Sequence, residues 1–167
     1  LGRPWAIPGT PGLEHRVGGL EKQDITGNVS YDPANHEHMC KLRQEKVDRV
    51  SARIPATEIE GDPDGDLLVL GWGGTYGALR AGVKAMRERG HKIGHVQLRN
   101  LNPFPADFAE VLRRYDRVLV PELNLGQLST VIRGRYLIDA RPYTKVQGKP
   151  FKESEIKDAI AAQLEAH

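Results

Sequence analysis

The chain of 167 residues is 39% hydrophobic and 28% charged, with a formal net charge of +2 at pH 7. This balance is typical of a globular domain, and no apolar run approaches the roughly 20 residues that cross a bilayer. The small net charge does not favour binding to nucleic acid, because such proteins usually concentrate lysine and arginine on one face. The length suits one compact core with an extended arm. We therefore expect no membrane and no nucleic acid as partner.

Cys40 is the single cysteine of the sequence. It allows no intramolecular disulfide and no cysteine-only metal site, which fits a reducing cytoplasm as the location. Any cysteine-bound cluster would have to be held by another chain. The sequence starts at Leu1 without a methionine or a signal peptide, which favours a segment of a longer protein over a trimmed small one.

Residues 1–31 form an arm rich in proline and glycine. Pro8-Gly9, Pro11-Gly12 and Gly18-Gly19 interrupt any helical or strand periodicity. The arm nevertheless carries apolar side chains, so we expect it to lie on a partner surface. These residues are Trp5, Ile7, Leu13, Val17, Leu20 and Ile25.

An amphipathic helix is predicted from about Pro33 to Ser51. Asp32 can cap its free backbone N–H groups, and Pro33 is tolerated in the first turn. The segment from Glu58 to Gly65 is acidic and aperiodic, which predicts a linker. The chain therefore divides into residues 1–65, with arm, helix and linker, and residues 66–167, an α/β domain. The apolar stripe of the helix comprises Met39, Leu42, Val47, Val50 and Ile54.

From Asp66 onward, apolar runs alternate with helical periodicities. A continuous apolar run typical of a buried strand occupies residues 67–70, and further strands are predicted at residues 92–98 and 117–121, each followed by a helical pattern. A weaker strand at residues 143–146 and a last helix through Ile156 and Ile160 complete the chain. Repeated strand–helix units with short loops predict a mainly parallel sheet with helices on both faces.

The loop Gly71–Gly77 lies between the first strand and its helix, where a dinucleotide-binding loop would be found. Its spacing differs from G-x-G-x-x-G, because the third glycine would fall at Tyr76. The second strand also ends in Gln97 and Asn100 where an acidic residue would be expected. A tight turn explains the glycines better than a nicotinamide cofactor does.

Three possible metal ligands, His36, His38 and Cys40, alternate along the predicted helix. Residues two apart point about 200° apart, so His36 and Cys40 can share a face while His38 cannot. We interpret this segment as an exposed helix turn. His91 and His95, at the start of the second strand, are interpreted as surface residues. Arg133, Arg135 and Arg141 could bind an anion or form a subunit-facing edge, and the edge is favoured.

No Ser–His–Asp set, carboxylate pair or metal cluster stands out, so the sequence predicts no catalytic, cofactor-binding or metal-binding residue in this chain. Several segments together resemble the α subunit of 2-oxoacid:ferredoxin oxidoreductases of the 2-oxoglutarate type, and their order and spacing cover nearly the whole chain. They are Gly9–His15, Gly27–Pro33, Leu70–Gly73, Asn102–Pro105 and Pro121–Leu128.

The resemblance implies that the α/β domain is similar to the C-terminal domain of transketolase. It implies an upstream pyrimidine-side domain, a β subunit, and the cofactors thiamine diphosphate, Mg²⁺ and [4Fe–4S] elsewhere in the complex. The implied reaction converts 2-oxoglutarate, coenzyme A and oxidised ferredoxin to succinyl-coenzyme A, carbon dioxide and reduced ferredoxin. This chain would serve assembly and be inactive alone. A pyruvate or branched-chain 2-oxoacid enzyme, a free-standing nucleotide-binding module and an interaction module remain alternatives.

The loops that follow parallel strands share one edge of a sheet. We expect this edge to contact the rest of the complex, although helix capping is an equal explanation for Glu122 and Asn124. The predicted contact residues are Gly73, Gly74, Thr75, Asn100, Asn102, Glu122, Asn124 and Gln127.

Overall fold

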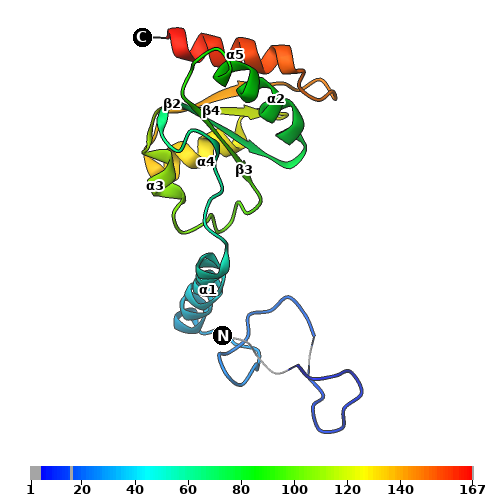
Figure 1. Cartoon of the computed structure of the whole chain (residues 1–167). Helices are drawn as coiled ribbons and strands as arrows, with labels where there is room; N and C mark the ends of the chain where they lie inside the picture. The colour runs from blue at the N-terminus through cyan, green and yellow to red at the C-terminus, as the bar shows by residue number, and fades with distance from the viewer. Residues whose placement is uncertain (1–4, 16, 167) are drawn as a thin grey trace. The chain divides into compact units, whose positions relative to one another are not determined.

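The computed structural model describes residues 5–15 and 17–166. It divides into two units between Arg53 and Ile54, and each is described by itself. The first contains the arm, helix α1 (Pro33–Asp48) and a 3-10 turn at Arg49–Arg53. The second contains a five-stranded sheet with helices α2 to α5 (Figure 1).

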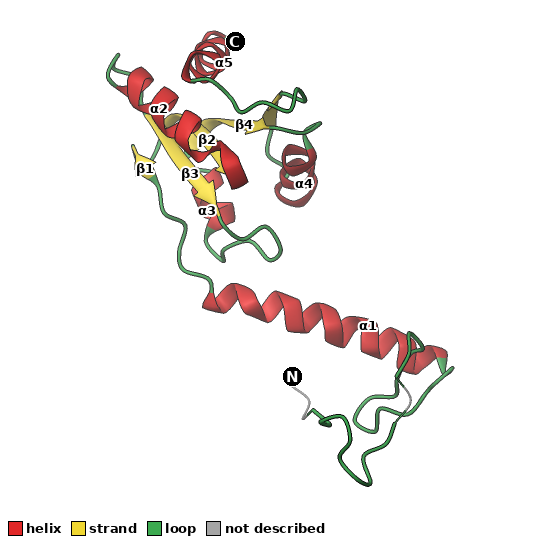
Figure 2. Cartoon of the chain, turned by 90° about the vertical axis from the view of Figure 1, so that its right-hand side faces the viewer, coloured by secondary structure: helices red, strands yellow, loops and turns green. Residues whose placement is uncertain are grey.

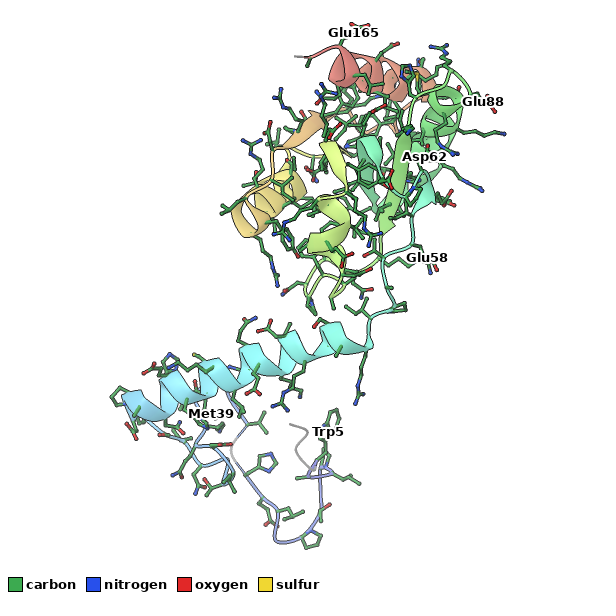
Figure 3. All side chains as sticks on the ribbon, turned by 60° about the vertical axis from the view of Figure 1, so that its left-hand side comes forward. Trp5, Met39, Glu58, Asp62, Glu88 and Glu165 are labelled. Carbon is green, nitrogen blue, oxygen red and sulfur yellow. The ribbon has the colours of Figure 1, made fainter. Side chains whose placement is uncertain are left out.

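Helix α1 begins where the sequence predicts it. The Asp32 carboxylate accepts a hydrogen bond from the backbone N–H of Ala34 at 2.9 Å, and Pro33 occupies the first turn. The α-helix ends at Asp48, before the predicted end at Ser51, and continues as the 3-10 turn. Of the predicted apolar stripe only Met39 is buried, on the side of α1 that meets the arm (Figure 3).

Ionic contacts fasten the arm to α1 more than apolar packing does. Arg43 donates two hydrogen bonds, each of 3.0 Å, to the two carboxylate oxygens of Glu21. His36 Nδ1 lies 2.8 Å from the same carboxylate. The hydrogen bonds from Arg43 and then His36 lower the pKa of Glu21 to about 2. The arm also carries one antiparallel bridge between Lys22 and Val29.

The second unit confirms the predicted α/β class. The strands stand in the order β1-β3-β2-β4-β5, with β2 parallel to both β3 and β4, and β4 parallel to β5. Strand β1 alone runs antiparallel, beside β3. The strands are β1 (Glu60–Gly61), β2 (Gly65–Trp72), β3 (Ile93–Leu98), β4 (Tyr115–Glu122) and β5 (Ala140–Thr144).

Helices cover both faces of the sheet (Figure 2). On one face, Leu68 and Leu70 of β2 pack with α3 (Phe108–Leu112) and α4 (Gln127–Tyr136). On the other, Leu67 and Val69 pack with α2 (Tyr76–Arg87) and α5 (Glu153–Glu165). Because successive side chains of a strand point to opposite faces, this continuous apolar run supplies both cores. None of the helices in the described residues is long and apolar enough to span a bilayer.

The prediction of a linker at Glu58–Gly65 is wrong, because Glu60–Gly61 form the edge strand β1. The backbone N–H of Ile93 donates to the Asp62 carboxylate at 3.1 Å, and the Tyr115 hydroxyl donates to the Asp62 carbonyl at 2.6 Å. A two-residue strand has no periodicity to detect. Its residues therefore belong with the sheet unit, which begins at Ile54.

Strand β5 lies at Ala140–Thr144, earlier than the predicted residues 143–146. Its Arg141 and Pro142 are exposed, so the strand lacks the apolar run that marks a central strand. Proline is compatible with this position because β5 is an edge strand.

A close approach at Gly94 leads to a stability prediction. A Cβ on Gly94 would lie 2.1 Å from the Tyr115 hydroxyl and 2.8 Å from the Asp62 carbonyl oxygen. We expect Gly94→Ala to lower the free energy of unfolding by about 1–3 kcal/mol in urea denaturation, because the packed neighbours must shift. Gly77→Ala in α2, where a Cβ meets open space, is the control and should be neutral or slightly stabilising. Equal stability of the two variants would contradict the packing argument.

Candidate functional site

Two features of the sheet unit are candidates for function. The first is the edge at which β2, β3 and β4 end, because these parallel strands bring their following loops to one side of the sheet. Gly73, Gly74, Asn100 and Asn102 are exposed in the loops after β2 and β3. These residues are therefore free to meet a partner. Thr75 is buried, and its hydroxyl donates to the Trp72 carbonyl at 2.9 Å.

The loop after β4 is organised by intramolecular caps. The Glu122 carboxylate is fully buried and accepts hydrogen bonds from the backbone N–H groups of Leu128 and Ser129, both at 2.9 Å. Asn124 Oδ1 accepts from the N–H groups of Gly126 and Gln127 at 2.7 and 3.2 Å. Capping of α4 is thus the observed role of both side chains. Glu122 and Thr75 offer almost no surface to a partner, which corrects their place among the contact residues.

The same loop exposes apolar side chains that the sequence interpretation did not single out. Leu125 is 81% exposed and Leu123 is 39% exposed. They alternate with the capping residues Glu122 and Asn124, so the caps hold the two leucines in a fixed turn. We call the exposed residues at this edge the carboxyl-edge surface. It comprises Gly73, Gly74, Asn100, Asn102, Leu123, Leu125 and Gln127, together with the half-buried Asn124.

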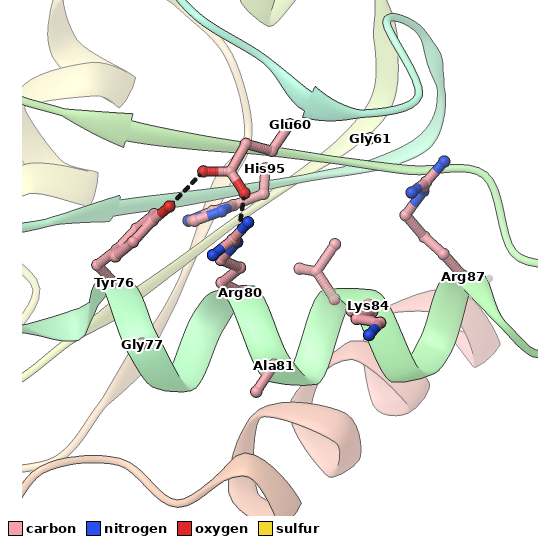
Figure 4. Close-up of a pocket in the computed structure, with 10 residues that line it drawn as sticks. Glu60, Gly61, Tyr76, Gly77, Arg80, Ala81, Lys84, Arg87 and His95 are labelled. Atoms are coloured by element: carbon pink, nitrogen blue, oxygen red, sulfur yellow. Dashed lines mark hydrogen bonds and ion pairs between the residues drawn. The ribbon is translucent and has the colours of Figure 1, made fainter.

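The second feature is a polar cluster where β1, β3 and the start of α2 meet (Figure 4). His95 of β3 is the antiparallel neighbour of Glu60 on β1. The Tyr76 hydroxyl donates to Glu60 Oε1 at 2.7 Å, and Arg80 Nε lies 2.8 Å from Glu60 Oε2. The Tyr76 ring stacks on His95, with centroids 5.8 Å apart and an interplanar angle of 25°. A tyrosine–glutamate bridge therefore lies beside a histidine.

His95 is buried, which corrects the interpretation of a surface residue. Its side chain is 1% exposed, and among the described residues neither ring nitrogen has a hydrogen-bond partner. Burial lowers its pKa below the usual value, while Glu60 opposes this shift and Arg80 reinforces it. The imidazole is therefore neutral at pH 7, with one donor and one acceptor unused. Each costs about 1–3 kcal/mol when buried without a partner.

Two cavities, of about 640 and 570 Å³, open beside this cluster. Both are lined by Glu60, Tyr76 and His95. The smaller one is also lined by Gln97, whose Oε1 is buried without a partner in the described part of the chain. Gln97 follows His95 by two residues on β3, so both side chains point to the same face of the sheet. This is the face that α2 covers, and it holds the unpaired His95 nitrogens and the unpaired Gln97 Oε1.

The possible metal ligands on α1 form a cluster with Glu21 of the arm. Glu21, His36 and Cys40 bring three possible ligand atoms within 4.8 Å of one another. His38 is not part of this group and instead lies 2.8 Å from Asp24. The Arg43 guanidinium binds both oxygens of Glu21 and reaches Cys40 Sγ at 3.3 Å. A fixed cation at the centre of the group makes it an ion-pair network that opposes binding of a metal ion.

The arginines after β4 are engaged within the chain. Arg133 and Arg141 both pair with Asp139, and the Arg141 Nε distance is 2.8 Å. The Arg135 guanidinium lies over the ring of Phe104 at 5.6 Å. Arg133 and Arg141 thus share one carboxylate, and all three side chains are exposed.

Comparison with solved structures defines the class of protein first. The fold is similar to that of a split-gene transketolase, with a TM-score of 0.51 at 16% identity over 64% of this chain and 41% of that one. A closer match is 2-oxoglutarate:ferredoxin oxidoreductase from Magnetococcus marinus, which was solved with 2-oxoglutarate, coenzyme A and succinyl-CoA bound. That match has a TM-score of 0.86 and 34% identity, over 97% of this chain and 29% of that one. The class is a transketolase-like α/β domain.

Sequence comparison then gives the family. Residues 65–158 match the family described as pyruvate:ferredoxin oxidoreductase core domain II, and the chain belongs to this family. It is 52% identical over 166 residues to 2-oxoglutarate oxidoreductase subunit KorA of Mycobacterium tuberculosis. It is 30% identical over 148 residues to 2-oxoacid:ferredoxin oxidoreductase 1, subunit alpha, of Aeropyrum pernix. These matches cover 98% and 84% of this chain but only 25% and 23% of the relatives.

The cap at Glu122 gives a stability prediction for the chain alone. Glu122→Ala should lower the free energy of unfolding by about 2–3 kcal/mol, because it removes a buried carboxylate and leaves two N–H groups unpaired. Gln127→Ala, at an exposed neighbour, should change it by less than about 0.5 kcal/mol. Urea denaturation followed by circular dichroism measures both. A Glu122→Ala chain as stable as the parent would show that the cap contributes little.

The buried histidine gives a prediction with a pH dependence. At pH 7.5, His95→Leu should unfold with the same or a higher free energy than the parent, because it removes two unpaired polar atoms. His95 has a folded-state pKa below its unfolded value, so the unfolded chain binds a proton more readily. The parent should therefore lose stability relative to the variant as the pH falls from about 6.5 toward that lower pKa. A pH-independent difference would show that folding leaves the pKa of His95 unchanged and would contradict this prediction.

Proposed function

We propose that this chain is the core domain II segment of the α subunit of a 2-oxoglutarate:ferredoxin oxidoreductase, and that it serves assembly of the enzyme. The observation that supports this most strongly is 52% identity over 166 residues to a 2-oxoglutarate oxidoreductase subunit. The chain spans about a quarter of the length of that relative. Both the arm unit and the sheet unit therefore have counterparts in a much longer subunit.

The proposed reaction of the complete enzyme is oxidative decarboxylation of 2-oxoglutarate. Coenzyme A would receive the succinyl group, carbon dioxide would leave, and ferredoxin would receive the electrons. The relatives from M. tuberculosis and M. marinus are named for 2-oxoglutarate, which supports this substrate over pyruvate or a branched-chain 2-oxoacid. We propose the upstream pyrimidine-side domain and the β subunit as the partners, in the cytoplasm.

The residues of this chain are consistent with a supporting role. Thiamine diphosphate with Mg²⁺ would supply the carbanion chemistry of the complex. A [4Fe–4S] cluster takes four cysteine thiolates, and these 167 residues contain one cysteine, so the cluster ligands would come from elsewhere in the complex. Cys40 is moreover bound into the Arg43 network of α1. The chain's proposed contribution is a rigid surface on which the partners dock.

The carboxyl-edge surface is the proposed docking site. It combines exposed leucines with polar groups on loops that a parallel sheet holds together, and apolar patches of this kind mark contact surfaces. The cap by Glu122 holds the Leu123–Leu125 turn before binding, which reduces the entropy that association must offset. The Pro- and Gly-rich arm, with Trp5 93% exposed, is proposed as a second contact (Figure 3).

The chain alone should show no oxidoreductase activity. Supplied with thiamine diphosphate, Mg²⁺, 2-oxoglutarate, coenzyme A and ferredoxin, it should reduce ferredoxin no faster than a blank without protein. The complete α and β subunits, purified together, should give reduction that depends on 2-oxoglutarate. Turnover by the chain alone would overturn the assignment of a supporting domain.

Substitution of two exposed leucines, one at the carboxyl edge and one away from it, tests the proposed docking site. Leu125→Ser at the carboxyl edge should weaken association of the α and β subunits about 10- to 100-fold, since burial of a leucine is worth roughly 1.5–3 kcal/mol. Leu137→Ser is the matched control, because Leu137 is 90% exposed but precedes β5 at the opposite edge. Analytical ultracentrifugation of the subunits measures both. Equal effects of the two substitutions would rule out the carboxyl edge as the contact with the β subunit.

A further inference from the structure

The larger cavity beside His95 has a basic wall. Arg80, Lys84 and Arg87 line it from one side of α2 at intervals of four and three residues, which places them on one helix face (Figure 4). Glu60 is the acidic residue among the lining side chains, and the remainder includes the small or apolar residues Gly61 and Val83. Three cations therefore face one carboxylate within the lining, and Asp62, outside the lining, pairs with Arg87.

The basic groups retain hydrogen-bonding capacity. Arg80 and Arg87 use Nε in their ion pairs with Glu60 and Asp62, each at 2.8 Å. The interactions found within the described residues leave the terminal NH₂ groups of both guanidinium ions without a hydrogen-bond acceptor. The ammonium of Lys84 has its nearest carboxylate, Glu88, at 3.9 Å, beyond hydrogen-bonding distance. These donors match the oxygens of a phosphate or a carboxylate.

His95 adds a polar group that the fold leaves unsatisfied. It lines the same cavity, and its neutral ring offers one donor and one acceptor without partners. A solvated face of a helix accounts for exposed lysines and arginines, but it gives no reason to bury an unpaired imidazole beside them. A bound molecule with a hydroxyl or acid oxygen would satisfy both the imidazole and the basic wall.

We propose that this cavity binds a small organic anion whose phosphate or carboxylate group is held by Arg80, Lys84 and Arg87 and whose further polar group reaches His95. The cavity volume of about 640 Å³ lies in the range of small-molecule sites. The ring nitrogens of His95 are buried and the Tyr76 ring stacks on the imidazole, so in the proposed complex the Tyr76 ring turns away from Glu60. Tyr76 is the first residue of α2 and is 39% exposed, which leaves its side chain room to turn. The site is independent of the proposed docking role.

The test is a titration of the full chain, labelled with ¹⁵N in its histidine rings, with two probes. Inorganic phosphate and glutarate represent the two acid groups, and sodium chloride at equal ionic strength is the blank. We expect saturable movement of the His95 ring signals with at least one probe and none with chloride. The probe that binds more tightly identifies the acid group of the ligand.

Variants locate the binding. Lys84→Ala changes an exposed side chain that the fold does not need, and it should lower the affinity for the probe at least fivefold. Arg99→Ala removes a cation from the smaller cavity, and Arg113→Ala removes an exposed one on the loop after α3, so both should bind within twofold of the parent. His95→Leu, checked for folding by circular dichroism, should weaken binding at least tenfold as measured by calorimetry.

Three outcomes would overturn the proposal. One is a response to both probes that never saturates or equals that of chloride. Another is equal binding by Lys84→Ala and the parent, or a loss in Arg99→Ala alone. The third is a structure of the complete enzyme in which another protein segment fills the cavity and pairs with His95.

Discussion

Both edges of β2 are hydrogen-bonded to parallel neighbours, and both of its faces are buried in apolar cores. This arrangement positions everything else in the sheet unit. Because β3 and β4 run parallel to β2, their following loops emerge at the same edge and form the carboxyl-edge surface. Because β3 must pack against α2, the side chains of His95 and Gln97 are carried beneath that helix. One pattern of strand pairing therefore generates both the proposed docking surface and the polar cluster.

The sequence predicts the central architecture because β2 and β4 are strongly apolar, and because each of the strands β2, β3 and β4 is followed by a helical pattern. It does not predict β1, whose two residues acquire their conformation from pairing with β3 and from the contacts of Asp62. It also locates β5 too late, because an edge strand with Arg141 and Pro142 exposed has no apolar signature. Local patterns thus predict elements that form two-sided cores, whereas short edge elements depend on tertiary contacts.

The candidate sites divide in the same way. Proximity of the loops after β2, β3 and β4 follows from the parallel topology and is predictable. The burial of His95 is not, because it depends on the Tyr76 ring and on Glu60, which are distant in sequence. The role of Glu122 is only partly predictable, because its position before a helix is equally compatible with capping that helix and with contacting a partner. Only the two N–H donors from α4 distinguish them. Near the polar cluster, the sequence shows Tyr76 four residues before Arg80, which places both on one face of α2. This spacing is common in helices and does not by itself indicate a buried histidine.

The exposed apolar residues of the arm have a consequence for the life of the chain before assembly. Trp5, Val17 and Ile25 are each about nine-tenths exposed, and Met39 is the one buried hydrophobic residue of α1. A chain without its partners would present these side chains to chaperones and proteases, which recognise exposed apolar segments. Under the proposed docking of the arm on a partner, these side chains are covered in the assembled enzyme and exposed in the separate chain.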